Sequence, residues 1–380
     1  MTPQFHSLRV AQVRPETADT VSIAFEVPPA LRDAYRFTQG QFLTLKARVD
    51  GTDGGTDGGT DGGTDGGTEL RRSYSICCGV QDYDARGELR VAVKRVADGV
   101  FSTWLHRNAV PGRAFDVMVP DGRFHVPLDA TAARHHVAFA AGSGITPVLS
   151  LIRTTLAHEP NSRFTLVYGN RSVDSIIFSE ALEDLKNQYL ARFTLYHVLS
   201  RQPQEVDLLH GRLDRARVAR FLSSLLPVDD IDAAFVCGPA SMIDEVEGAL
   251  RDAGLDPRRM HAERFGVPVA PAQRAAAPAV SDVGTGVGSD LVVVLDGKQH
   301  RMRLPGPDAK VLDTALAAGL DLPYACKGGV CCTCRARVLE GEVEMEKNYT
   351  LEPWEMAKGF VLTCQARALT PRVVVSYDER

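Results

Sequence analysis

The sequence has no apolar run long enough to span a bilayer and no excess of positive charge. Its 43 Lys and Arg residues are outnumbered by 48 Asp and Glu residues, which gives a formal net charge of −5. That balance provides no basic patch of the kind that nucleic acid binding needs. Residues 1–6 lack the charged and apolar regions of a signal peptide. We therefore expect a cytoplasmic protein that binds neither nucleic acid nor a membrane.

The composition is that of an ordinary globular protein. With 380 residues, of which 44% are hydrophobic and 24% charged, the chain is long enough for two or three domains. It contains eight cysteines. In a reducing compartment, cysteines in this number indicate metal binding and not disulfides.

Four of the cysteines form a motif near the C-terminus. Cys326, Cys331 and Cys334 have the spacing C-x4-C-x2-C, and Cys364 follows after a long gap. This is the ligand spacing of a plant-type 2Fe-2S cluster. Two bridged iron ions need four thiolates from different directions, and one tight loop supplies only three of them. The four cysteines are therefore the predicted metal ligands.

A structural zinc site is the alternative for these cysteines. Zinc favours two short cysteine pairs, whereas Cys364 has no cysteine beside it, so the pattern favours the cluster. Gly328 and Gly329 let the backbone turn closely around such a group. Cys332 has no iron assigned to it, and we interpret it as a small residue that supports the loop.

The hydrophobic pattern divides the chain into blocks, so the predicted fold is multidomain. Residues 1–130 alternate apolar and polar in short runs, which predicts an antiparallel β-barrel. Residues 131–265 alternate buried strands with helical stretches, which predicts an α/β domain with a doubly wound parallel sheet. Residues 266–290 read as a linker rich in Ala, Pro, Val and Gly. Residues 291–380 hold the cysteine motif in an α+β pattern.

Smaller features refine these blocks. Four copies of Thr-Asp-Gly-Gly occupy residues 52–67, carry no apolar side chain and predict a disordered hairpin loop. A calcium-binding repeat is the alternative, but the period is wrong and the apolar position is missing. In the last block we expect a strand over residues 291–295 and helices over residues 311–318 and 351–358.

A short motif follows the repeat. Arg72, Tyr74 and Ser75 lie in a predicted strand, and we expect all three to project from one face and hold one flat ligand. An arginine can pair with a phosphate, and a tyrosine can stack on an aromatic ring. Taken alone, such a trio is more often an ordinary exposed strand face.

Together these motifs resemble the ferredoxin-NADP reductase superfamily over nearly the whole chain. The resemblance implies an FAD-binding barrel, an NADP-binding domain and a β-grasp-like plant-type ferredoxin domain over residues 291–380. It implies that Arg72 meets the FAD pyrophosphate, that Tyr74 packs on the isoalloxazine and that Ser75 lies near the reactive flavin nitrogen. Tyr74 and Ser75, with Cys237, would be the catalytic residues. Gly99, Ser102 and Thr103 resemble the helix start that binds the rest of the pyrophosphate, although a simple N-cap is an alternative for Ser102.

Two further motifs resemble the nucleotide site of that superfamily. Gly142-Ser143-Gly144-Ile145-Thr146-Pro147 follows a predicted strand and opens a helix, so Gly142, Gly144, Thr146 and Pro147 would face a pyrophosphate. Cys237 and Gly238 begin a segment like the superfamily's C-G-P-x-x-M, where backbone and thiol lie beside the nicotinamide. A buried structural cysteine is the alternative for Cys237.

Cations near the adenosine 2′-phosphate distinguish NADPH from NADH in the superfamily. Ser200 and Arg201 resemble its Ser-Arg pair, and Arg171 is a second cation nearby in the sequence. NADPH is therefore the preferred donor, with NADH as the alternative. At the end of the middle block, Glu263 or Phe265 would lie near the flavin, and an ordinary final strand is the alternative there.

The order flavin barrel, nucleotide domain, linker and cluster implies conversion of a two-electron donor into single electrons. Within the superfamily, this order and the cysteine segment resemble the reductases of phenylacetyl-CoA epoxidases, which are multicomponent di-iron oxygenases. The implied partner is such an oxygenase complex in aerobic phenylacetate degradation. A reductase for a steroid- or ring-hydroxylating oxygenase is the alternative, and a redox-sensing module with inactive flavin motifs is a third.

Overall fold

The computed structural model describes residues 4–49, 68–97, 99–265 and 288–379. The expected repeat loop at residues 52–67 and most of the expected linker lie outside the described residues. The chain forms two compact units, Phe5–Phe265 and Gly266–Arg380, the second of which also includes Met1–Gln4. The described helices include none that is long and apolar enough to cross a membrane.

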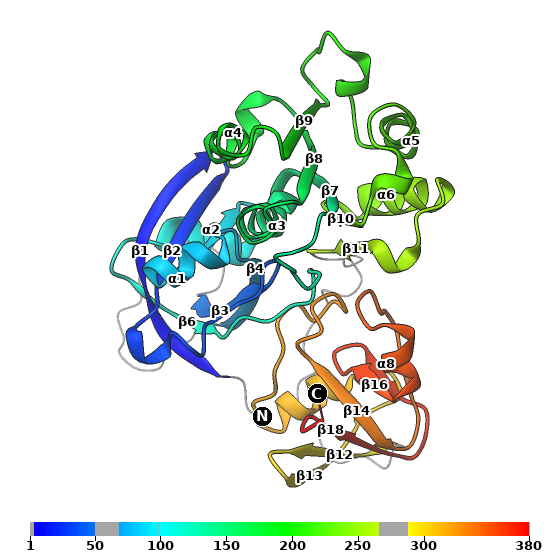
Figure 1. The fold of residues 1–380 in the computed structure, drawn as a ribbon. Helices are drawn as coiled ribbons and strands as arrows, with labels where there is room; N and C mark the ends of the chain where they lie inside the picture. The colour runs from blue at the N-terminus through cyan, green and yellow to red at the C-terminus, as the bar shows by residue number, and fades with distance from the viewer. Residues whose placement is uncertain (1–3, 50–67, 98, 266–287, 380) are drawn as a thin grey trace. The chain divides into compact units, whose positions relative to one another are not determined.

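The first part of the Phe5–Phe265 unit is a six-stranded antiparallel sheet (Figure 1). Its strand order is β4-β3-β6-β1-β2-β5, and a bridge between Ile76 and Val91 links the two edge strands into a barrel. Apolar side chains from alternate strand positions fill its core. The elements are β1 (Phe5–Thr17), β2 (Thr20–Glu26), β3 (Phe42–Val49), β4 (Thr68–Ser75), α1 (Val80–Arg86), β5 (Glu88–Lys94), α2 (Val100–Asn108) and β6 (Ala114–Met118).

The second part of this unit is a five-stranded parallel sheet with the order β11-β10-β7-β8-β9. One core packs α3 and α4 against the sheet, and a second core packs α5 and α6 against the opposite face. The elements are β7 (His135–Ala141), α3 (Ile145–His158), β8 (Arg163–Asn170), α4 (Ser179–Gln188), β9 (Phe193–Leu199), α5 (Arg215–Ser224), β10 (Ala233–Cys237), α6 (Ala240–Asp252) and β11 (Met260–Glu263). The sheet therefore has the predicted doubly wound form.

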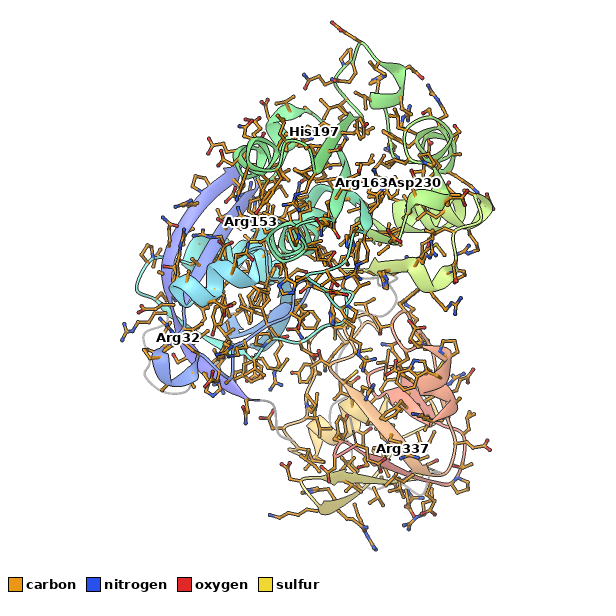
Figure 2. The ribbon with its side chains drawn as sticks, viewed as in Figure 1. Arg32, Arg153, Arg163, His197, Asp230 and Arg337 are labelled. Carbon is orange, nitrogen blue, oxygen red and sulfur yellow. The ribbon has the colours of Figure 1, made fainter. Side chains whose placement is uncertain are left out.

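The barrel is joined to the parallel-sheet domain by polar contacts between α1 and α3. The backbone N–H of Val80 donates to Thr154 Oγ1 over 3.1 Å. Arg153, which is labelled in Figure 2, forms an ion pair of 3.1 Å with Asp82. Because both side chains of that pair are about one-third exposed, the pair contributes at most about 1 kcal/mol, and the seam rests mainly on packing.

The Gly266–Arg380 unit contains a five-stranded mixed sheet of order β13-β12-β18-β14-β16 and a two-stranded sheet of β15 and β17. Strands β12 and β18 run parallel at its centre, and the other pairs are antiparallel. The elements are β12 (Asp290–Leu295), β13 (Lys298–Arg303), α7 (Val311–Ala317), β14 (Arg335–Glu340), β15 (Val343–Met345), α8 (Pro353–Ala357), β16 (Phe360–Leu362), β17 (Ala366–Ala368) and β18 (Arg372–Ser376). This is the expected α+β arrangement.

Candidate functional site

Three polar side chains meet where β4, β10 and β11 end. Ser75 is the last residue of β4, and its hydroxyl donates a hydrogen bond of 3.0 Å to Glu263 at the end of β11. Glu263 pairs in register with Cys237, the last residue of β10. The carboxyl ends of parallel strands form the ligand-binding edge of a doubly wound sheet. The contact therefore brings a barrel residue to that edge.

Burial sets the protonation states of Glu263 and Cys237. Loss of hydration raises the pKa of Glu263 to about 8, and the hydrogen bond from Ser75 only partly opposes that shift. Burial, followed by the nearby carboxyl of Glu263, raises the pKa of the Cys237 thiol well above its usual range. At neutral pH both groups are therefore protonated, and Glu263 holds a proton within reach of the Ser75 hydroxyl.

Arg72 and Tyr74 share a face of β4. Arg72 is exposed, and its charge acts on the half-buried phenol of Tyr74, so the two side chains are close. The expectation that Ser75 projects from the same face is wrong, because successive strand residues alternate between faces. Ser75 is 4% exposed and points to Glu263 instead.

Helix α2 lies against Tyr74. The ring of Phe101 stacks on that of Tyr74 with centroids 6.4 Å apart. Gly99 caps the helix, and the Ser102 hydroxyl donates to the carbonyl of Gly99 over 3.2 Å while accepting from the N–H of Val96. These bonds give Ser102 a local role in closing the turn. Thr103, one residue further on, is partly exposed in the first turn of the helix.

The turn that begins at Gly142 and the end of β10 approach each other closely at Gly144. A Cβ atom on Gly144 would lie 2.0 Å from the carbonyl oxygen of Cys237 and 2.8 Å from the backbone N of Gly238, so only glycine fits there. Gly142 has a positive φ of 53°. Thr146 is buried and its hydroxyl donates to the carbonyl of Ser143, 3.0 Å away, while Pro147 is buried in the first turn of α3. The turn and the end of β10 thus form one surface.

Tyr168 is a site residue that sequence reasoning missed. Its buried hydroxyl donates a hydrogen bond of 2.9 Å to the carbonyl of Gly142 and so fixes the turn from below. The hydrophobic pattern predicts only a buried strand over this segment. The available signal is the polar end of a tyrosine in an otherwise apolar run, since a buried phenol usually finds a hydrogen-bond partner.

The structure brings Arg171 and Arg201 together at the ends of β8 and β9. The N–H of Arg201 donates to the carbonyl of Arg171 over 2.8 Å, and the Ser200 hydroxyl donates to the carbonyl of Asn170. Both arginines are exposed. Phe265 is 46% exposed just beyond β11, whereas Glu263 is half-buried at the end of that strand.

The four cysteines of the C-terminal motif converge in two pairs. Cys326 interacts with Cys331, and Cys334 with Cys364, each through a thiol hydrogen bond. The bond from Cys331, followed by backbone N–H groups including that of Gly328, lowers the pKa of Cys326 to about 6. The bond from Cys334, followed by the side chain of Gln365, lowers the pKa of Cys364. Within each pair one thiol therefore ionises more readily than the other, and a bound cluster would need all four as thiolates.

The loop that carries these thiols is held in unusual backbone conformations. Lys327, Gly329 and Cys332 all have positive φ, at 50°, 77° and 56°. Non-glycine residues in this region cost about 1–3 kcal/mol each and persist where the surroundings impose them. Gln365 contributes to that constraint, because its Nε2 donates to the carbonyl of Lys327 over 3.0 Å and to the sulfur of Cys364 over 3.5 Å.

The donor set fits a binuclear cluster. Among the described residues, no three His, Cys, Asp or Glu side chains are arranged to hold one metal ion. Two thiol pairs could supply the four ligands of a two-iron cluster, whereas tetrahedral zinc needs four ligands around one point. N–H groups that point at the sulfurs, such as that of Gly328 at 3.2 Å from Cys326 Sγ, would stabilise the negative charge of a bound cluster.

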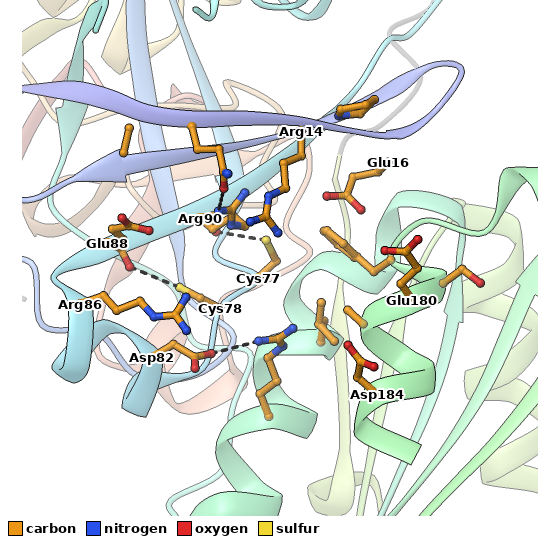
Figure 3. Close-up of a pocket in the computed structure, with 18 residues that line it drawn as sticks. Arg14, Glu16, Cys77, Cys78, Asp82, Arg86, Glu88, Arg90, Glu180 and Asp184 are labelled. Carbon is orange, nitrogen blue, oxygen red and sulfur yellow. Dashed lines mark hydrogen bonds and ion pairs between the residues drawn. The ribbon is translucent and has the colours of Figure 1, made fainter. Parts of the chain in front are cut away.

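A separate charged cavity of about 780 Å³ lies between the barrel and helices α3 and α4 (Figure 3). None of the site residues named above lines it. Its walls carry four arginines and five carboxylates together with the buried thiols of Cys77 and Cys78. Burial raises the pKa of the Cys78 thiol to about 11, so this neighbouring pair of thiols is not activated for chemistry.

Comparisons with known proteins agree with this architecture. The family model of the oxidoreductase NAD-binding domain matches residues 139–248, and that of the 2Fe-2S iron-sulfur cluster binding domain matches residues 293–369. The chain is 45% identical over 376 residues to a component of the 1,2-phenylacetyl-CoA epoxidase of Escherichia coli (strain K12), a match that covers 99% of this chain and 98% of that protein.

Two other matches extend this group. The chain is 35% identical over 371 residues to the ferredoxin reductase component of 3-ketosteroid-9-alpha-monooxygenase of Rhodococcus rhodochrous, with 97% of this chain and 96% of that protein covered. Among solved structures, phthalate dioxygenase reductase has the same fold, with a TM-score of 0.58 at 21% identity and 98% of both chains covered.

The domain matches and the fold define an oxidoreductase of the electron-transfer class, with an FAD/NAD-binding reductase fold and a 2Fe-2S domain. The sequence identities to the two relatives narrow this class of oxidoreductases to a family. The chain belongs to the family of oxygenase reductases that includes the Escherichia coli and Rhodococcus rhodochrous relatives. The predicted family, fold class and cofactor types (FAD, nicotinamide nucleotide and 2Fe-2S cluster) are confirmed at this level.

Proposed function

We propose that this chain carries electrons from NADPH to a di-iron oxygenase that acts on phenylacetyl-CoA. The observation that supports this most is the 45% identity to a component of a phenylacetyl-CoA epoxidase across nearly the full length of both proteins. The chain itself would not bind phenylacetyl-CoA, because its site residues serve electron carriers. Its contribution is to bind, orient and insulate those carriers.

The barrel edge would hold the flavin. The exposed guanidinium of Arg72 is available for a pyrophosphate, and the ring of Tyr74 offers an apolar surface to a flat ring. We assign Gly99, Ser102 and Thr103 to the same pyrophosphate through the backbone at the start of α2. The hydrogen bonds that already occupy the Ser102 hydroxyl favour a backbone contribution at that residue.

The end of the parallel sheet would hold the nicotinamide nucleotide. The turn of Gly142 and Gly144, with Thr146 and Pro147 behind it, would receive the pyrophosphate, and Cys237 and Gly238 would lie beside the nicotinamide. The contact between Gly144 and Cys237 supports this assignment, because one ligand could then touch both motifs. Ser75 and Glu263 stand at the same edge and could hold or pass one proton.

Recognition of NADPH over NADH would rest on the arginines at the ends of β8 and β9. Arg171 and Arg201 are adjacent through a backbone hydrogen bond, and the Ser200 hydroxyl is tied to Asn170 beside them. Two exposed guanidiniums suit a doubly charged phosphate. Phe265 would cover the flavin from the exposed end of β11.

Cys326, Cys331, Cys334 and Cys364 would bind the 2Fe-2S cluster. When bound, flavin takes up a hydride as two electrons and the cluster takes electrons one at a time, so together they match a two-electron donor to a one-electron acceptor. Reduced thiolates are needed to hold the iron, and all eight cysteines are free. We therefore place the protein in the cytoplasm.

A steroid-hydroxylating oxygenase is the second candidate partner. The supporting observation is the 35% identity to a reductase of 3-ketosteroid-9-alpha-monooxygenase over almost the whole chain. The lower identity makes this candidate the weaker one.

Reconstituted turnover tests the proposal. Purified protein is combined with NADPH and, in separate reactions, with the oxygenase components of a phenylacetyl-CoA epoxidase and of a 3-ketosteroid monooxygenase. We expect substrate-dependent NADPH oxidation and product only with the epoxidase. Product only with the steroid enzyme would favour the second candidate, and failure to reduce ferricyanide with NADPH would reject both.

A further inference from the structure

Gln365 buries a polar side chain directly after the predicted cluster ligand Cys364. Only 5% of the residue is exposed. Glutamine is mostly a surface residue, because a buried amide loses its bonds to water and needs partners inside the protein. The partners of this amide therefore indicate its role.

The amide nitrogen of Gln365 is surrounded by acceptors. Its Nε2 lies 3.0 Å from the carbonyl oxygen of Lys327, 3.1 Å from the carbonyl oxygen of Cys364 and 3.5 Å from the sulfur of Cys364. Because carbonyl oxygens only accept hydrogen bonds, the amide must turn its NH2 group and not its oxygen toward them. Two amide protons thus serve three acceptors, and one of these acceptors is a predicted ligand sulfur.

The backbone and the stem of Gln365 hold the amide in this position. Its N–H donates to the carbonyl of Leu362 over 2.8 Å, and its own carbonyl accepts from the N–H of Glu346 over 3.1 Å. The stem packs on Gly329, where a Cβ atom would lie 3.2 Å from Gln365 Cγ. A donor that is already fixed needs little reorganisation when a negative charge develops beside it, so it stabilises that charge effectively.

The bonds of the amide have two kinds of effect. The bond to Lys327 joins segments 38 residues apart and holds the ligand loop in place, which is a structural effect. The bond to the Cys364 sulfur acts on a ligand atom, and hydrogen bonds to ligand sulfurs are among the factors that set the potential of an iron-sulfur cluster. The N–H of Gly328 also points at a ligand sulfur but belongs to the backbone. The contribution of Gln365 can instead be removed by replacing one side chain.

We propose that Gln365 raises the reduction potential of the cluster by donating a hydrogen bond to the sulfur of Cys364. Reduction adds one electron, and thus one unit of negative charge, to the cluster and its ligands. A fixed N–H dipole aimed at a ligand sulfur therefore favours the reduced form over the oxidised form. An electron that arrives from the flavin is held more tightly as a result. This inference rests on the proposed function, since it needs Cys364 as a cluster ligand.

Redox titration of the loaded full-length protein tests the proposal. The variants are Gln365→Met, which keeps the length of the side chain without a donor, and Gln365→Glu, which replaces the amide nitrogen by an oxygen. Gln299→Met is the matched control, because Gln299 is exposed on β13 of the same unit. Iron content and visible absorbance show how much cluster each variant holds. The EPR signal of the reduced cluster is then recorded at a series of applied potentials.

The expected result is a cluster that is harder to reduce. In Gln365→Met the ratio of reduced to oxidised cluster at a fixed potential should fall about three- to tenfold, the scale of a single hydrogen bond. A tenfold change corresponds to about 59 mV for a one-electron couple. Gln365→Glu should fall at least as far, because a carboxyl oxygen repels the added charge. Gln299→Met should match the wild type, and the potential of the flavin should not change in any variant.

A measurement on the wild type covers the case in which the variants do not hold a cluster. Protein carrying ¹⁵N in the side-chain amides of glutamine is reduced with dithionite and studied by pulsed EPR. A hydrogen bond from Gln365 to the Cys364 sulfur predicts a coupling between the unpaired spin of the reduced cluster and the amide nitrogen.

The outcomes separate the two effects of the amide. An unchanged cluster potential in Gln365→Met, or a wild type without the nitrogen coupling, would overturn the proposal and leave Gln365 with a structural role alone. An equal shift in the potential of the flavin would also overturn it, because the effect would then not arise at Cys364. A wild type that assembles no 2Fe-2S cluster would instead reject the proposed cluster ligands.

Discussion

At the scale of single residues, burial decides what the polar groups of the site can do. Ser75, Cys237 and Glu263 are held at one strand edge, where burial disfavours the charged forms of the thiol and the carboxyl. A carboxyl that stays protonated at neutral pH is a proton holder and not a fixed charge. That property follows from its place between the barrel and the parallel sheet, and it has a measurable consequence for stability.

The stability of the protein should fall between about pH 4.5 and pH 8 because of Glu263. Burial raises the pKa of Glu263 from 4.5 to about 8, so the native state keeps a proton that the unfolded chain has lost above pH 4.5. Its stabilisation is complete below that pH and is lost as the pH rises through about 8, at up to about 1.4 kcal/mol per pH unit. A glutamine at position 263 cannot titrate. The unfolding temperature of Glu263→Gln should therefore lose the part of its pH dependence that comes from Glu263.

Thermal unfolding at several pH values checks this expectation. Glu205→Gln, which removes an exposed carboxylate, is the matched control and should follow the wild type. If wild type and Glu263→Gln show the same slope, Glu263 is ionised in the native protein and the proton-holding role is wrong.

The cations at the ends of β8 and β9 should set the choice of nucleotide. A charged hydrogen bond to the 2′-phosphate is worth about 1.5–3 kcal/mol, so Arg201→Ala should raise the KM for NADPH about 10- to 100-fold. NADH lacks that phosphate, and its KM should be unaffected. Initial rates with ferricyanide as acceptor measure both constants. Arg36→Ala, an exposed arginine paired with Asp33, is the control, and equal effects on both nucleotides would remove Arg201 from this role.

Residue types and spacing supplied the members of the candidate site, whose roles stay predictions, but could not supply how their side chains face. The strand period places Ser75 on the face opposite to Tyr74, so one flat ligand cannot meet both side chains from the same side. Tyr168 could not be singled out, because its partner is a carbonyl 26 residues away that only the sheet brings near. The contact of Ser75 with Glu263 spans 188 residues and depends on how the barrel packs against the parallel sheet.

At the scale of elements, local sequence signals predicted the type and position of the helices and strands well, and their end residues less well. The strand expected over residues 291–295 is β12, Asp290–Leu295, and the helix expected over residues 311–318 is α7, Val311–Ala317. The helix expected over residues 351–358 is shorter, because Glu352 caps α8 and Pro353 occupies its first turn. The Thr-Asp-Gly-Gly repeat lies outside the described residues, so its expected structure stays a prediction.

The cysteine loop offers a paired test at this scale. Cys331→Ser should abolish the visible absorbance of the cluster while flavin remains bound, because one of four ligands is replaced by a poor one. Cys332→Ser changes the adjacent thiol, which donates to Thr350 and is not among the predicted ligands. It should keep the absorbance. Iron content and visible spectra of both variants give the answer, and loss of the cluster only in Cys332→Ser would overturn the ligand assignment.

At the scale of the whole molecule, the order of the blocks was readable because each block has its own hydrophobic period. Alternation with period two predicted the barrel, and buried strands between helices predicted the parallel sheet. The hydrophobic pattern could not predict that the barrel and the parallel-sheet domain form a single compact unit. Their joint comes from scattered partners such as Val80 with Thr154 and Asp82 with Arg153, which carry no sequence signal of their own.

That organisation predicts how the activity divides. A fragment of residues 1–265 contains the whole Phe5–Phe265 unit, including the Ser75–Glu263 contact, and should fold and retain FAD. Its NADPH-dependent reduction of ferricyanide, per bound flavin, should stay within about twofold of the full chain, since compact units keep their own packing. Turnover with oxygenase components should fall to background because the cysteine motif is gone. If ferricyanide reduction instead depended on residues 266–380, the cluster unit would complete the flavin site. The assignment of flavin and nucleotide to the Phe5–Phe265 unit alone would then be wrong.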